Sequence, residues 1–274
     1  MSLRKPFVAG RFYPSDKEDL LEQIKSCYSH RLGPGQNVVK ENVLGGVVPH
    51  AGYTFSGPCA SHFYSRIKDD FERVIIFSTL HKRCDKPVVD NRDYQTPLGT
   101  VKNLSKDTEI DLPTKNTVFD SEHSIEVQLP FLQQIKKDFS FLPVGVPRSS
   151  FSELEGLAKK LDHLINEKTL LISSSDMSHI GPNFGDLGIS NPGKVAEKRD
   201  SPVAKRILEK DPEKMLEAVK KHSSTMCGVY PTLALLYVLK GRDTVSKKLC
   251  YYTSQDIMDG ENAVGYLSLS FNKK

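Results

Sequence analysis

Residues 43–67 read VLGGVVPHAGYTFSGPCASHFYSRI, and this stretch decides the fold class. The apolar run over 43–49 is typical of a strand that is buried on both faces of a sheet. A helical segment over 56–67 follows it directly. A buried strand followed by a helix is the unit from which parallel sheets are built. The stretch therefore predicts an α/β protein.

The rest of the chain repeats this alternation. We expect further strands over 73–78, 139–146, 169–174, 247–255 and 263–271. We expect helices over 124–137, 152–167, 194–209, 212–222 and 229–240, the first of them kinked at Pro130. No linker or repeat divides the sequence, which predicts a single domain over residues 1–274. We expect it to be a layered α/β sandwich around a mixed, largely parallel sheet whose last two strands are antiparallel.

Composition argues against several classes of protein. The 274 residues carry 38 basic and 34 acidic side chains, and the net charge of +4 is scattered, so no nucleic-acid partner is expected. No apolar run reaches the roughly 18 residues that a membrane helix needs, and no signal peptide is recognised. Five cysteines without a CxxC pair favour reduced thiols. We therefore expect a cytoplasmic protein with no membrane partner.

Chemically active side chains follow three of the expected strands. His50 comes after the first strand, His81 after the second, and Asp176 and His179 after the strand over 169–174. Ligands in open α/β sheets bind beyond the carboxyl ends of the strands. A shared sheet edge would bring these side chains together, and imidazole and carboxylate groups bind metal ions and move protons near neutral pH. The pattern predicts a functional site at this edge.

Cys227 is a further candidate, because the sequence around it, TMCG, passes into a helix. A helix N-terminus favours the thiolate, which is the form that ligates metal ions. The alternative is a buried, unreactive thiol. Cys59 and His62 are spaced i,i+3 and could share a metal, whereas Cys84 lies in a charged run that is typical of a solvated loop.

The segment SEHSIEVQLPFL, residues 121–132, contributes Glu122, His123 and Glu126. Acidic residues stabilise the first turn of a helix, so we expect Glu126 to face solvent or to cap the helix. We expect His123 to reach a cleft, where it would form a hydrogen bond to a substrate or transfer a proton. The chain has no glycine-rich phosphate loop and no GxSxG motif, which leaves nucleotide binding and serine-hydrolase chemistry unsupported.

Seven features occur together in a fixed order: AGRFYP (9–14), VPHAGYTFSG (48–57), the strand that leads to His81, DYQTPLG (93–99), SEHSIEVQLPFL (121–132), SSSDMSHIG (173–181) and TMCG (225–228). This combination resembles the Memo family over essentially the whole chain. The resemblance implies the fold of class III non-haem iron extradiol dioxygenases. It also implies a metal pocket formed by His50, His81 and Cys227, with Asp176 and His179 nearby.

Such a pocket predicts metal-dependent redox chemistry with oxygen. Two imidazoles and a thiolate would leave positions on a metal open, and these donors suit Fe(II) or copper, with zinc as an alternative. His179 would act as acid or base, with Asp176 orienting it. His123 would form a hydrogen bond to the substrate or transfer a proton to it. The expected partner is a small molecule or a peptide bound in the metal cleft.

Two other functions stay open. Memo-like proteins of animals are linked to cell motility and to receptor phosphotyrosine peptides, so the resemblance also allows a non-enzymatic signalling adaptor with protein partners in the same cleft. A zinc-assisted hydrolase with His179 as base is the second alternative. The chain also departs from the common family pattern at two places: Lys82 follows a single His81 where many members have paired histidines, and Val229 stands where many have an arginine.

Overall fold

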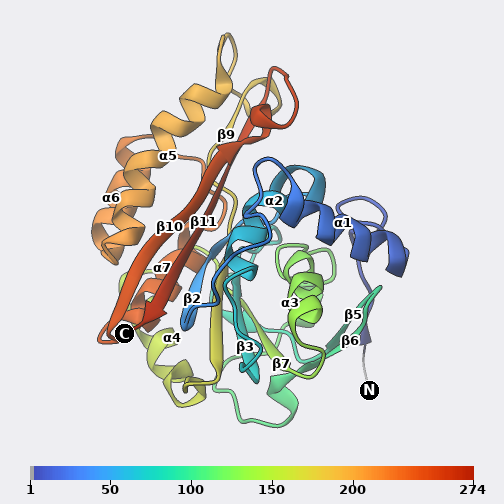
Figure 1. Ribbon diagram of the computed structural model, residues 1–274. Helices are drawn as coiled ribbons and strands as arrows, with labels where there is room; N and C mark the ends of the chain where they lie inside the picture. Colours follow the sequence, from blue (N-terminus) through green and yellow to red (C-terminus); the bar gives the residue numbers. More distant parts are fainter. Residues whose placement is uncertain (1–2) are drawn as a thin grey trace.

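The computed structural model describes residues 3–274 and shows one mixed sheet between two layers of helices (Figure 1). Its strands are β1 (Leu3–Arg4), β2 (Val43–Val48), β3 (Arg73–Ser78), β4 (Val88–Val89), β5 (Asp93–Thr96), β6 (Gly99–Asn103), β7 (Ser140–Gly145), β8 (Thr169–Ser174), β9 (His179–Ile180), β10 (Thr244–Thr253) and β11 (Ala263–Lys273). Their order across the sheet is β1-β5-β6-β7-β3-β8-β2-β11-β10, with β4 beside β7 and β9 beside β11.

The centre of the sheet is parallel. β7, β3, β8 and β2 are neighbours in that order and all run in one direction. β11 pairs antiparallel with both β2 and β10, as expected for the last two strands. The mixed α/β fold that the sequence predicts is therefore confirmed.

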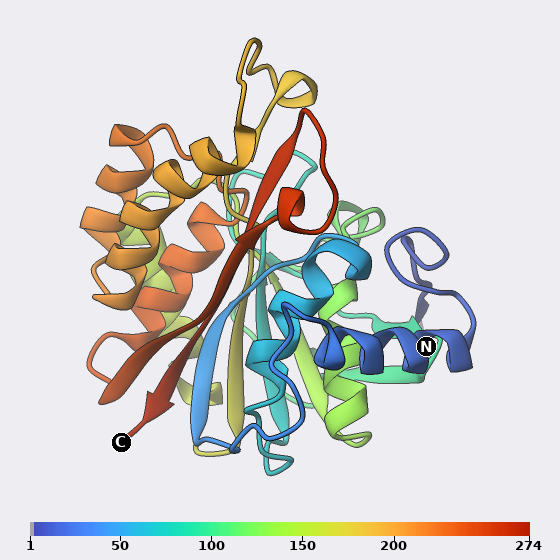
Figure 2. The same ribbon diagram turned by 45° about the horizontal axis from the view of Figure 1, so that its top comes forward.

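Helices cover both faces of the sheet. One layer holds α1 (Lys17–Ser29), α2 (Tyr53–Tyr64) and α3 (Leu129–Ile135), and the other holds α4 (Phe151–Leu161), α5 (Pro192–Leu208), α6 (Pro212–Lys221) and α7 (Val229–Leu239). Figure 2 shows the strands between these two layers. Short 3-10 turns connect the elements: η1 (Leu104–Lys106), η2 (Asn116–Val118), η3 (Glu126–Gln128), η4 (Asp162–Leu164), η5 (Pro182–Phe184) and η6 (Ser254–Asp256). Across residues 3–274, the helices are all too short or too polar to span a bilayer.

The sheet separates two hydrophobic cores, and β3 shows why the middle of a central strand is apolar. Successive side chains of a strand point to opposite faces. Ile75 and Phe77 lie in the core beneath α4 and α7, whereas Val74 and Ile76 lie in the core beneath α1 to α3. All four are fully buried. A strand covered on both faces leaves few positions for polar residues, and in β3 these are the two ends, Arg73 and the buried Ser78.

The expected helix over 124–137 is only partly correct. Its first turn is the separate 3-10 turn η3, and the α-helix itself begins at Leu129. Pro130 therefore lies in the first turn of α3, where its missing N–H costs no hydrogen bond, and it causes no kink.

The interpretation of Glu126 as a solvent-facing or capping residue is wrong. Its side chain is fully buried and forms an ion pair with Arg4 of β1, with Nη1 and Oε2 2.8 Å apart. It also accepts hydrogen bonds from the backbone N–H groups of Phe7 and Val8 and from the Tyr13 hydroxyl. Glu126 therefore anchors the N-terminal segment to the core.

Candidate metal centre

The carboxyl ends of three central strands meet at one edge of the sheet. β3, β8 and β2 are adjacent and parallel, and the loops that follow them carry His81, Asp176 and His50. The backbone N–H of His50 donates to Asp176, with N and Oδ1 2.7 Å apart, and this bond joins two of the loops. The strand order thus places side chains that are distant in sequence beside one another.

His50 and Cys227 are in direct contact. Cys227 Sγ lies 3.2 Å from His50 Nε2, and the backbone N–H of Asp176 donates to the same sulfur at 3.2 Å. His50 is almost fully buried, and burial lowers the pKa of its ring, which favours the neutral imidazole. A neutral imidazole nitrogen and a sulfur atom therefore lie side by side at the end of β2.

The position of the proton on His50 follows from its partner Ser174. The Ser174 hydroxyl donates its one proton to the Ser124 carbonyl at 2.6 Å, and its oxygen accepts from the Gln128 amide at 2.7 Å. His50 Nδ1, which lies 3.0 Å from that oxygen, must then be the donor. The lone pair of the ring is on Nε2 and faces Cys227. This is the tautomer that a metal ligand requires.

His81 is held by a buried carboxylate. Glu122 Oε2 lies 2.9 Å from His81 Nδ1 and also accepts the backbone N–H of His81 at 3.1 Å. Despite the burial of Glu122, its hydrogen bonds with His81 and Ser124 lower its pKa to about 2. An ionised carboxylate only accepts, so His81 Nδ1 carries a proton and Nε2 is the nitrogen free for a ligand.

His123 lies between the other two imidazoles. Its ring stacks on His81 with the ring centroids 5.1 Å apart and meets His50 edge to face at 5.4 Å. Burial, with the neighbouring His50, lowers the pKa of His123 to about 4. The ring is therefore neutral near pH 7 and can accept a proton or a metal. The structure thus adds a third imidazole to the pair implied by the resemblance.

Within residues 3–274, one group of three potential metal ligands lies close together: the ligand atoms of His81, Glu122 and His123 are within 4.8 Å of one another. This group differs from the expected set of His50, His81 and Cys227. Both oxygens of Glu122 already accept hydrogen bonds from His81 and the backbone of Ser124. We therefore interpret Glu122 as the residue that orients His81, with the imidazoles and the thiol as the donors.

The expectation that the start of a helix makes Cys227 a thiolate is wrong for the protein by itself. Cys227 does lie just before α7, but burial raises the pKa of its thiol well above the ordinary range and outweighs the hydrogen bond from Asp176. Bonding to a metal ion deprotonates a coordinating thiol outright. Metal ligation is therefore the condition under which Cys227 would be anionic here.

His179 and Asp176 do not form the pair that was expected. The Asp176 carboxylate accepts the backbone N–H of His50, and no hydrogen bond joins it to the His179 ring in the described part of the chain. The His179 ring packs against Phe184, with the centroids 5.1 Å apart, and its backbone N–H donates to Thr225. His179 is partly exposed and keeps its candidacy as an acid or base, without Asp176 as its orienting partner.

A pocket of about 360 Å³ opens beside His81. Lys82, Arg83 and Arg148 line it together with Tyr230, and its described lining includes no acidic side chain. A ligand with a negatively charged group would be attracted to this pocket.

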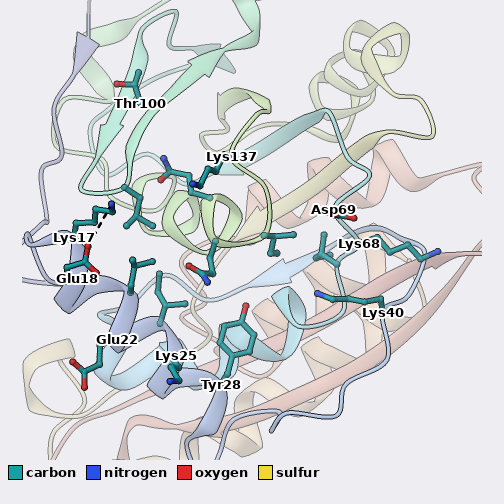
Figure 3. A pocket seen from close by; sticks show the side chains of 17 residues that line it. Lys17, Glu18, Glu22, Lys25, Tyr28, Lys40, Lys68, Asp69, Thr100 and Lys137 are labelled. Carbon is teal, nitrogen blue, oxygen red and sulfur yellow. Dashed lines mark ion pairs between the residues drawn. The ribbon is translucent and has the colours of Figure 1, made fainter.

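A larger hollow lies elsewhere and contains none of the candidate residues. It has a volume of about 1390 Å³ and lies along α1 and the end of α3 (Figure 3). Figure 3 shows lysines interspersed with acidic side chains around it, including the ion pair of Lys17 with Glu18. Volume alone therefore does not identify the functional site.

Changing Glu122 to glutamine is expected to lower the pKa of His81. The hydrogen bond that His81 donates to Glu122 raises that pKa, and burial, which lowers it, would then dominate. The pairing of Glu122 with His81 also stabilises the fold. This contribution is lost as the pH falls from the ordinary glutamate pKa, about 4.5, toward 2, and it weakens again as the pH rises through the raised pKa of His81. NMR titration of the metal-free protein measures the His81 pKa, with His163 as an internal control. An unchanged His81 pKa would contradict the pairing.

Comparison with known proteins agrees with the family resemblance of the sequence motifs. The family model described as Memo-like protein matches residues 4–270. A MEMO1 family protein of Methanopyrus kandleri is 34% identical, and the alignment covers 98% of this chain and 99% of that protein. A MEMO1 family protein of Nitrosopumilus maritimus is 33% identical, with 98% and 99% coverage.

A further relative and one solved structure were also found. A MEMO1 family protein of Thermotoga petrophila is 34% identical over 97% of this chain and 98% of that protein. The crystal structure of an uncharacterized protein from Escherichia coli K12 has a TM-score of 0.43 and 14% sequence identity, and the match covers 82% of this chain and 98% of that chain. The family match over nearly all of the sequence and the full-length relatives show that this chain belongs to the Memo-like protein family.

Proposed function

We propose that this protein binds one redox-active metal ion, iron or copper, between His50, His81 and Cys227. The observation that carries the proposal is the contact of His50 Nε2 with Cys227 Sγ at 3.2 Å, with the proton of His50 held on Nδ1 by Ser174. A lone pair and a sulfur that converge in a buried place form the start of a ligand set.

The chemistry of the donor set fits such an ion. Nitrogen and sulfur donors suit iron, copper and zinc, and they do not suit magnesium or calcium, which prefer oxygen. His81 is held by Glu122 in the way that carboxylates orient metal-binding histidines. When bound, iron or copper would supply one-electron and oxygen chemistry, whereas zinc would supply a Lewis acid for hydrolysis.

The chain's own residues would bind and orient a substrate around this point. His123, neutral and stacked on His81, would accept a proton from a bound molecule. His179, at the partly exposed start of β9, would exchange a proton at the rim. Lys82 and Arg148 in the adjacent pocket would hold a negatively charged group of a small molecule or peptide.

Elemental analysis of the purified full chain tests the proposal. Protein prepared under reducing conditions and offered iron, copper or zinc is expected to retain about one ion per chain. His50→Ala, His81→Ala and Cys227→Ser are each expected to lower retention by about tenfold or more. His163→Ala removes an exposed imidazole outside the site and should retain the ion at the wild-type level.

Three outcomes would reject the proposal. Folded wild-type protein that retains none of the three ions has no such centre. Retention that is unchanged in all three ligand variants would place the ion elsewhere. Retention of zinc alone would replace the redox function with zinc-assisted hydrolysis, for which hydrolysis of an ester and phosphate panel is the next measurement.

A further inference from the structure

A second cluster of reactive side chains lies between α2 and β10. Cys59 and His62 belong to α2, and Cys250 belongs to β10. α2 packs against β10 at this place, and the neighbouring Cys59 thiol and His62 ring lower the pKa of Cys250. Cys59 and Cys250 share a small hydrophobic cluster with Tyr252. None of these three reactive residues belongs to the metal centre described above.

Two local features hold this arrangement in place. The register of β10 against β11 shifts between Lys248 and Cys250, and such a bulge redirects the side chains that follow it. The backbone N–H of Cys59 donates to the Tyr252 hydroxyl at 3.1 Å, and the hydroxyl donates to the Phe55 carbonyl at 2.6 Å. The helix is therefore bonded to the same strand that carries Cys250.

His62 has a defined orientation toward Cys250. Its Nε2 lies 3.0 Å from the Leu32 carbonyl oxygen, which can only accept, so Nε2 carries a proton. Nδ1 is left for Cys250. The neighbouring Cys59 and His62 lower the pKa of Cys250, whereas burial raises the pKa of Cys59. Cys250 in turn raises the pKa of His62 despite the burial of the ring, so a Cys250 thiolate pairs with the protonated ring, in which Nδ1 also donates. Of the two cysteines, Cys250 is therefore the one that ionises more readily.

The two sulfurs differ in solvent exposure, so that an oxidant can reach one of them while the other is protected. Cys59 is fully buried, whereas Cys250 is partly exposed. Low-pKa, accessible cysteines next to a second cysteine are the usual targets of oxidants.

We propose that Cys59 and Cys250 are a redox-active dithiol that hydrogen peroxide converts to a disulfide linking α2 to β10. The Cys250 thiolate attacks one peroxide oxygen, the O–O bond breaks, and the leaving hydroxide takes a proton to become water. Cys250 is then a sulfenic acid. Cys59 sulfur attacks the Cys250 sulfur, the S–O bond breaks, and hydroxide leaves with the thiol proton as water. Two thiols lose two electrons in total, and the peroxide gains them.

Peroxide treatment of the reduced, metal-stripped full chain tests this step. Two of the five cysteines are expected to become unavailable to a maleimide under denaturing conditions. Trypsin cleaves after Lys40, Arg66, Lys248 and Lys273, which yields peptides 41–66 and 249–273 with one cysteine each. Mass spectrometry is expected to find these two peptides joined, and a reductant should separate them.

Variants assign the role of each residue. Cys59→Ser should leave a Cys250 sulfenic acid that dimedone traps, and Cys250→Ser should abolish the reaction at this pair. His62→Gln should slow disulfide formation by about tenfold, since less of Cys250 would be thiolate. Cys84→Ser removes a loop thiol outside the pair and should form the disulfide at the wild-type rate.

Peroxide treatment of the wild-type protein is enough to overturn the proposal, even if the variants do not fold. Oxidation of Cys84 or Cys227 with no joined peptides 41–66 and 249–273 would do so. Zinc uptake that is lost in Cys250→Ser and kept in Cys227→Ser would show that the cluster is a metal site instead. Because Cys59 and Cys250 are not ligands of the proposed centre, the result does not depend on that proposal.

Discussion

Changing Glu126 to alanine is expected to lower the free energy of unfolding by about 3–5 kcal/mol, because it leaves the buried guanidinium of Arg4 without its anion. Arg4 Nη1 and Glu126 Oε2 are 2.8 Å apart, and both side chains are almost wholly buried. The change also removes the acceptor for two backbone N–H groups and for the Tyr13 hydroxyl. Buried donors without partners add to the loss.

Urea unfolding of the metal-free protein measures this effect. The matched control is Glu155→Ala, which breaks the exposed ion pair with Lys159 on α4 and should change the free energy by about 0.5 kcal/mol or less. The double variant Arg4→Met with Glu126→Leu removes both charges and should recover much of the loss. Similar values for Glu126→Ala and Glu155→Ala would contradict the role of the buried pair.

Changing Gly228 to alanine is expected to lower metal affinity by about 10–100-fold, as loss of an outer-shell contact typically does. A Cβ at Gly228 would lie 2.4 Å from Ser175 Cβ and 2.9 Å from the Ser174 carbonyl oxygen. The N–H of Gly228 donates to Ser175 Oγ at 2.9 Å. Backbone must therefore move to admit the methyl group, and Cys227 moves with it. The strain should also cost about 1–3 kcal/mol of stability.

Gly156→Ala gives the opposite sign and serves as the control. Gly156 lies inside α4, and a Cβ there meets no atom within 4 Å. Alanine in a helix interior is expected to raise stability by about 0.5–1 kcal/mol without any effect on metal binding. Thermal unfolding and a competition titration with a metal indicator measure both quantities. Wild-type affinity in Gly228→Ala would show that the turn adapts without moving Cys227.

The central strands could be predicted because most of their residues are apolar. The pattern predicts β3 at 73–78, the residues that form it, since the interior of a strand covered on both faces is apolar. β1, β4 and β9 are two residues long, which is too short for any periodicity to appear. The prediction of a helix that begins before Pro130 was wrong, because proline is favoured in the first turn of a helix and α3 begins at Leu129.

The site could be predicted where it depends on topology alone. His50, His81 and Asp176 follow adjacent parallel strands, and the rule about carboxyl ends places them together. Glu122 could not be assigned to His81 in this way, because its segment is irregular and follows no strand of the central sheet. Arg4 holds that segment by donating to the Phe119 and Glu122 carbonyl oxygens, a contact across more than a hundred residues.

The position of β2 has a consequence for how the chain is made. β2 is synthesised early, yet its two neighbours in the sheet, β8 and β11, leave the ribosome much later. Until then the nascent chain has an apolar strand with both hydrogen-bonding edges unpaired, which invites association with other chains. Full pairing of β2 must therefore wait until β11, the last strand of the chain, has been synthesised.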